Sequence, residues 1–196
     1  MARLARVSFG VALVALLSGP AFSAGSQTNG VAISGSAVNT CTLSAPTVFS
    51  TSGAALSSST LTSGTIAISD FVDTSDATYI DGVSIILTFD AMCNYPSHFN
   101  SQTLTGGLKS TTPVVAGSGP FVTTLNYSAG LTWGGQTSNL GTNGSALRKG
   151  VQRNVAGSFK GTAQLNITLS NPTVGSTPVV AGAFTDQLTI QIGAAL

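Results

Sequence analysis

Apolar and polar residues alternate with a period of two along several stretches of this chain. In the clearest run, residues 158–170, apolar residues or glycine occupy every second position: Phe159, Gly161, Ala163, Leu165, Ile167 and Leu169. Successive side chains of a β-strand point to opposite faces of a sheet, so this period is typical of a strand with one buried face. After residue 24, no stretch of a dozen residues has helical periodicity. The chain is therefore predicted to be all-β.

Further strands are predicted at 41–48, 65–69, 83–93, 102–108 and 121–133, and at the two ends of the mature chain. In the run 121–133 most odd-numbered residues are apolar or aromatic, and Gly130 is predicted to mark a bend or bulge. Stretches rich in Ser, Thr, Gly, Asn or Pro at 50–59, 111–120, 134–144 and 171–178 are predicted to be loops. Short strands with such turns favour a two-sheet sandwich, and one domain is expected at 39–196.

The two end segments form a pair of their own. One face of the first segment carries Val31, Ile33, Gly35 and Ala37, and one face of the last carries Phe184, Leu188, Ile190 and Ile192. Only four residues follow Ile192, so no later strand is expected to cover the edge of the last one. An exposed edge is an aggregation hazard unless a partner strand pairs with it. Residues 24–38 are therefore predicted to leave their own domain and donate a strand, which favours a subunit that assembles with copies of itself.

The first 23 residues are predicted to be a secretory signal peptide. Arg3 and Arg6 precede an apolar run at 7–17, and small residues at 21–24 offer cleavage after Ser23 or Ala24. The alternative, a transmembrane anchor, needs about 20 apolar residues, and this run is shorter. No second apolar run is long enough to span a bilayer, so the mature protein is expected to be exported without a membrane span.

Charge excludes one class of partner. Two of the seven basic residues lie in the signal peptide, so five basic and six acidic residues remain, a net charge of −1. Nucleic-acid binding is not expected, because no basic patch is present. The charged fraction of 7% is far below the roughly 25% of ordinary globular domains. A surface of this kind suits a protein that packs against copies of itself.

The two cysteines, Cys41 and Cys93, are predicted to form one structural disulfide, because an exported chain meets an oxidising compartment. Cys93 continues the apolar face of 83–91, and Cys41 continues the face of Ile33, Gly35 and Ala37. A metal or redox pair is disfavoured, since the chain has no CxxC motif and a single histidine, His98.

The chain resembles the spore coat protein U domain family, whose members include subunits of archaic chaperone-usher pili. The matching pieces are residues 31–41, Ala91-Met-Cys-Asn94 and residues 181–192. The resemblance implies an immunoglobulin-like, pilin-type sandwich that lacks its last strand. It further implies that a periplasmic chaperone holds the subunit and that an outer-membrane usher assembles it. The N-terminal segment of the next subunit then completes the fold in a surface fibre or coat.

Other chemistry is weakly supported. Asp70, Asp73, Asp76 and Asp81 offer oxygen ligands for Ca²⁺, but their spacing matches no EF-hand and favours a solvated loop. His98 with Asp90 and a serine suggests a triad, yet no Gly-x-Ser-x-Gly elbow is present, and a surface histidine in a loop is favoured. A glycosidase pair of Asp90 and Asp186 is disfavoured. Neither an enzyme nor a cofactor is predicted.

An aromatic platform is the basis of the second hypothesis. Tyr79, Tyr95, Tyr127 and Trp133 are the candidates for stacking on a sugar. Tyr127 and Trp133 share strand parity with apolar residues and are predicted to lie in the core. The alternative function is a self-contained secreted adhesin that binds a glycan or a host surface.

Overall fold

The structure is a computed structural model that describes residues 34–68, 71–80, 82–116, 119–144, 147–170 and 177–194. The chain divides into two compact units, Met1–Ser36 and Ala37–Leu196. Of the first unit only residues 34–36 are described, and they form no regular element. The predicted signal peptide, the donor residues Val31 and Ile33, and the acidic residues Asp70 and Asp81 lie outside the described residues. Gly35 and Ala37 are exposed and belong to no strand.

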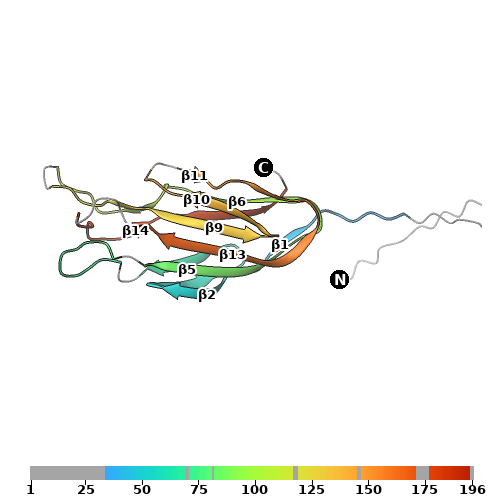
Figure 1. The fold of residues 1–196 in the computed structure, drawn as a ribbon, viewed down its shortest axis with the longest axis horizontal. Coiled ribbons are helices and arrows are strands. Elements are labelled where there is room, and N and C mark those ends of the chain that lie inside the picture. Colours follow the sequence, from blue (N-terminus) through green and yellow to red (C-terminus); the bar gives the residue numbers. More distant parts are fainter. Residues whose placement is uncertain are drawn as a thin grey trace, which may run out of the picture. The chain divides into compact units, whose positions relative to one another are not determined.

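The second unit is an all-β sandwich, as predicted. Its larger sheet has the order β1-β5-β13-β9-β10, and β2 pairs with β5 on the same side as β1. Figure 1 shows β2, β5, β13 and β9 lying side by side. All pairings between these strands are antiparallel. The strands are β1 (Cys41–Leu43), β2 (Thr47–Ser52), β5 (Ser84–Cys93), β9 (Tyr127–Trp133), β10 (Gln136–Gly141) and β13 (Phe159–Leu169).

The second sheet is built on β6 (Ser97–Thr103). One edge of β6 pairs with β15 (Leu188–Gly193), and the other pairs with β11 (Arg148–Lys149) and β12 (Arg153–Val155). Two small sheets complete the unit. One joins β14 (Phe184–Thr185), β7 (Leu108–Ser110) and β8 (Thr124–Leu125), and the other is the hairpin of β3 (Ala54–Ser59) and β4 (Gly64–Ile68).

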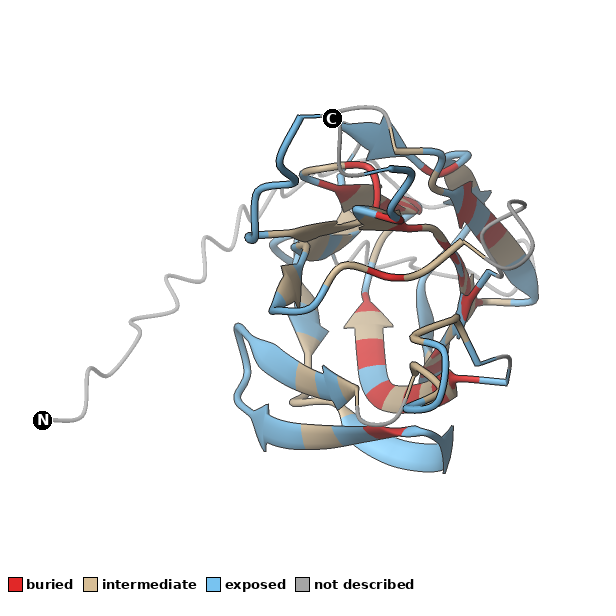
Figure 2. Ribbon diagram, turned by 90° about the vertical axis from the view of Figure 1, so that its left-hand side faces the viewer, coloured by how far each residue is buried: buried red, intermediate tan, exposed pale blue. Residues whose placement is uncertain are grey.

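The core lies between the inner faces of the two main sheets. Every odd residue from Val83, just before β5, to Cys93 at the end of β5 is buried, which confirms the predicted alternation. On β6 the inward residues are Ser97, Phe99, Ser101 and Thr103, at most 1% exposed. Figure 2 shows buried residues alternating with more exposed ones along the strands. Period two therefore operates in both sheets, although on β6 mostly hydroxyl side chains face inward.

Several predicted loop and strand bounds are wrong. The predicted loop 134–144 contains β10, because Gly134 and Gly135, with φ of 56° and 75°, form the two-residue turn of a β9-β10 hairpin. The predicted loop 50–59 contains the end of β2 and the whole of β3. The strand predicted at 102–108 ends at Thr103, because Gly106 and Gly107, both with positive φ, make a turn before β7.

Gly130 marks no bulge. It pairs in unbroken register with Asn139 of β10 and Asn166 of β13. Its missing side chain makes room on the outer face, where an added Cβ would lie 3.4 Å from Asn139 Oδ1.

Candidate strand-binding cleft

Among the described strands, the C-terminal strand β15 has a partner on one edge only. It pairs with β6 in the register Leu188 to Thr103 through Gly193 to His98, and no other described strand pairs with it. Just before this register, the Leu104 amide donates to the Gln187 carbonyl at 2.9 Å. Hydrogen-bonded pairs alternate along an antiparallel ladder, so the backbone groups of Leu188, Ile190 and Ile192 point away from β6. This edge presents their amides and carbonyls to an added strand.

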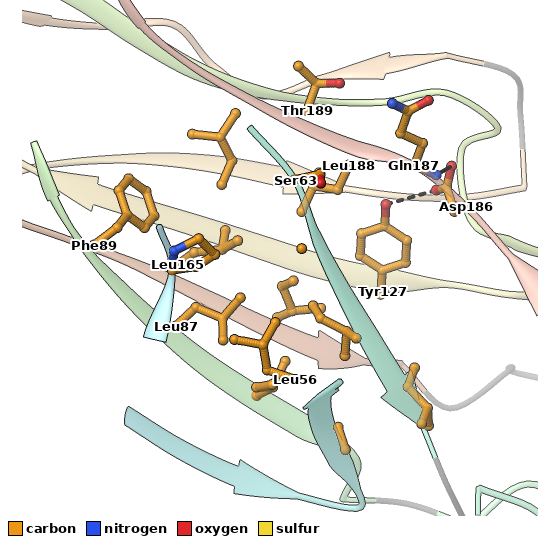
Figure 3. A pocket seen from close by; sticks show the side chains of 18 of the residues that line it. Leu56, Ser63, Leu87, Phe89, Tyr127, Leu165, Asp186, Gln187, Leu188 and Thr189 are labelled. Carbon is orange, nitrogen blue, oxygen red and sulfur yellow. Dashed lines mark hydrogen bonds between the residues drawn. The ribbon is translucent and has the colours of Figure 1, made fainter. Parts of the chain in front are cut away.

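An apolar cleft of about 480 Å³ lies beside this edge. Leu188 and Ile190 of β15 form one wall, and the opposite lining comes from β5, β13 and the β3-β4 hairpin: Leu56, Ile66, Leu87, Phe89 and Leu165. Figure 3 shows Phe89 at one end and Tyr127 with Asp186 at the other, with leucines between them. The side chains of Leu188 and Ile190 are only partly buried. The cleft therefore offers both unpaired backbone and uncovered apolar surface.

Asp186 lies at the polar end of the cleft, where its carboxylate accepts hydrogen bonds from two segments, residues 103–107 and β9. Its Oδ2 accepts from the Thr103 hydroxyl and, at 2.8 Å, from the Tyr127 hydroxyl. Its Oδ1 accepts from the Thr105 amide at 3.0 Å and the Thr105 hydroxyl at 2.7 Å. The Gly107 amide donates to Oδ2 at 3.2 Å. The carboxylate is therefore saturated with donors.

These contacts decide the ionisation of Asp186. Burial opposes the charged form, but hydrogen bonds from Thr103, Thr105 and Tyr127 outweigh it and lower the pKa of the Asp186 carboxyl below its ordinary value. Burial, with the adjacent Asp186 charge, raises the pKa of the Tyr127 hydroxyl. Asp186 is thus an anion at neutral pH, and Tyr127 is its neutral donor.

The disulfide predicted between Cys41 and Cys93 is confirmed. The two residues are direct partners in the β1-β5 ladder, with Cα atoms 4.2 Å apart. Asn94 binds the chain just before β1: its Nδ2 donates to the Val38 carbonyl at 2.8 Å, and its Oδ1 accepts from the Thr40 amide at 2.7 Å. These contacts fix the start of the second unit against β5.

One predicted feature of the last strand is wrong. The segment 184–192 is two strands, because β14 pairs with β7 and β15 pairs with β6. Phe184 therefore lies in a different sheet from Leu188, Ile190 and Ile192, and its ring packs edge-on against Phe71 at 5.7 Å. The break falls at Asp186 and Gln187, where the carboxylate binds the turn after β6.

The other candidate sites are not assembled as chemical centres within the described residues. Asp73 and Asp76 each cap a turn, accepting from the amides and hydroxyls of Ser75 and Thr78 respectively. His98 lies on β6, not in the predicted loop, and its Nδ1 contacts Asn154 Oδ1 on β12. Asp90 is exposed on β5 of the other sheet, near the Thr162 hydroxyl. Among the described residues, no three His, Cys, Asp or Glu side chains form a metal-binding group.

The aromatic candidates are divided between core and periphery. Trp133 is 1% and Tyr127 5% exposed, so both are buried as predicted. Trp133 stacks edge-on with Phe99 at 6.0 Å and with Phe159 at 5.4 Å. Tyr79 and Tyr95 are partly buried, and Tyr95 places its hydroxyl 3.4 Å from Cys41 Sγ. These side chains do not form one exposed platform.

Sequence reasoning missed the role of Asp186 and the strand β3 in the wall of the cleft, although it predicted a strand at 65–69, where β4 lies. A signal for Asp186 was present, since it shares the parity of Leu188, Ile190 and Ile192 and is the acidic member of an apolar row. No such signal marks β3, whose residues 57–59 are three serines.

No protein-family model matches the chain, and no curated protein matches it significantly. None of the described residues belongs to a helix with the length and apolarity needed to cross a bilayer.

Proposed function

We propose that this protein is an exported structural subunit of a surface fibre or coat, which polymerises by accepting a β-strand from another copy. The observation that carries the proposal is the unpaired edge of β15 beside an apolar cleft. An edge strand with uncovered apolar neighbours is stabilised by a strand that supplies backbone hydrogen bonds and alternate apolar side chains.

The segment 24–38 is the proposed occupant, supplied by the next copy. Its row of Val31, Ile33, Gly35 and Ala37 presents apolar or small residues at every second position. From residue 31 to residue 37 an extended chain spans about 20 Å, and β15 from Leu188 to Gly193 spans about 17 Å. The donor row and the acceptor edge are therefore matched in length and in chemistry.

The pathway follows from the family resemblance. A subunit with an uncovered cleft needs protection before assembly, and the proposed partners are a periplasmic chaperone, an outer-membrane usher and related subunits. In this proposal the domain is an immunoglobulin-like, pilin-type sandwich that lacks its last strand. Its sparse charge is compatible with close packing of copies.

The test is the oligomeric state of the mature protein with and without residues 26–38, measured by size-exclusion chromatography with light scattering. We expect polymers from the mature protein and monomers from the shortened one. The matched variants are Ile33→Asp, which puts a charge on the donor row, and Ser34→Asp, which puts it on the opposite face. Ile33→Asp should block polymers and Ser34→Asp should not. Polymers from the shortened chain would refute strand donation.

A further inference from the structure

The polar end of the cleft joins the two main sheets. Tyr127 belongs to β9 of the larger sheet, whereas Thr103 ends β6 of the smaller one, and both donate to Asp186 Oδ2. Asp186 itself lies two residues before β15. The start of the acceptor strand is therefore held at a fixed place between the sheets by hydrogen bonds.

These bonds matter because the rest of the cleft is apolar. Its walls carry leucine, isoleucine and phenylalanine side chains, and the hydrophobic effect favours bringing such walls together when nothing fills the space. Closing the cleft would require β15 to move toward β5 and β13. The Tyr127 to Asp186 hydrogen bond resists that movement, since Tyr127 is 5% exposed and held within β9.

We propose that Asp186 and Tyr127 form a tie that holds the cleft open before a strand enters, so that both are positioning residues for strand capture. This inference rests on the proposed function. The tie stabilises the empty protein and the geometry of its acceptor edge. Once a strand fills the cleft, the strand itself keeps the walls apart, and the tie contributes less.

The proposal is tested by removing the Tyr127 hydroxyl in an empty and in a filled protein. The empty form is the mature chain with Ile33→Asp, which cannot donate its strand. The filled form is the same chain carrying an unaltered second copy of residues 26–38 on a flexible linker after Leu196. Tyr127→Phe is introduced into both, and Thr132→Val is the matched control. Thr132→Val removes one hydroxyl that pairs with Thr137 at 2.9 Å on the outer face of the larger sheet.

We expect Tyr127→Phe to lower the melting temperature at least twice as much in the empty form as in the filled form, and Thr132→Val to act equally in both. Capture of a synthetic peptide of residues 26–38 should slow by about tenfold in the empty Tyr127→Phe protein, the order expected for one hydrogen bond to a charged group. Equal losses of melting temperature in the two forms would overturn the tie and leave a purely structural hydrogen bond.

The same measurements separate this inference from the proposed function. If the added strand fails to stabilise even the unsubstituted protein, strand donation is refuted. Hydrogen exchange of the amides of Thr189, Gln191 and Gly193, which face β6, in the empty form then tests the tie alone. Faster exchange in Tyr127→Phe than in Thr132→Val supports it, and unchanged exchange overturns it.

Discussion

Asp186 is a carboxylate inside an otherwise apolar row, and its protonation state should be visible in stability. Hydrogen bonds to the ionised form lower its folded pKa, so its contribution is fully present above the unfolded pKa, about 3.9, and is lost as the pH falls through the folded pKa. Tyr127 is the titratable group that faces it. Lys109 lies opposite Thr185 and Arg148 opposite Thr103, and neither forms an ion pair with Asp186.

We therefore expect the melting temperature of the protein to decrease when the pH is lowered below about 4. Asp186→Asn should be less stable than the unsubstituted protein at pH 7, and the melting temperatures of the two proteins should converge in acid. The pKa of Asp73 is also lowered, by hydrogen bonds from Ser75. We therefore attribute to Asp73 any decrease of the melting temperature in acid that remains in Asp186→Asn. Thermal scans from pH 7 to pH 2.5 measure both effects. A constant difference between the two proteins across this range would contradict the assignment.

At the scale of strands, the sequence predicts those elements whose inward residues are apolar. β5, β9 and β13 were predicted from period two, because positions such as Leu87, Leu131 and Leu165 are apolar and buried. The strand predicted at 102–108 is displaced by several residues from β6, because Ser97, Ser101 and Thr103 face the core yet are residue types typical of loops. The cleft was predicted only as a free edge, since its outer wall needs β3, whose three serines carry no apolar period, as the partner of the strand predicted at 65–69.

Small inward residues on β6 allow the smaller sheet to meet β10 of the larger one at Gly150. The Gly150 amide donates to the Ser101 carbonyl at 2.7 Å, and the next amide, of Val151, donates to the Asn139 carbonyl at 3.2 Å. A Cβ on Gly150 would lie 2.9 Å from Ser138 Oγ and 3.0 Å from Ser101 Oγ. Both serines are fully buried and cannot move into solvent.

Gly150→Ala should therefore lower the free energy of unfolding by about 1–3 kcal/mol, the usual effect of overpacking a core. Gly157→Ala is the matched control, because an added Cβ there meets nothing within 4 Å. Urea unfolding followed by tryptophan fluorescence measures both, and Trp133 is the single tryptophan. Equal urea midpoints for the two variants would mean that the strands around Gly150 move apart to accommodate the added Cβ without a loss of stability.

Within the described residues of the second unit, the two main sheets are joined along one side, and the opposite side is left uncovered. β10 and the β11-β12 edge meet around Gly150, whereas β15 and the β3-β4 hairpin leave the cleft between them. A domain with one uncovered side lacks part of the apolar burial that stabilises a closed sandwich. Its stability should then depend strongly on the covalent link between β1 and β5.

The disulfide should therefore supply a large share of the stability. Cys41 and Cys93 are 52 residues apart, and closing a loop of that length is worth about 4 kcal/mol in the chain-entropy model. Domains have roughly 5–15 kcal/mol in total. In the Ile33→Asp background, reductant should lower the urea midpoint to that of the Cys41→Ser, Cys93→Ser double variant, which reductant should leave unchanged. An equal midpoint for the oxidised and reduced proteins would show that the packing of β1 and β2 on β5 holds this edge without the bond. The uncovered side would then have to be stabilised by the remaining core alone.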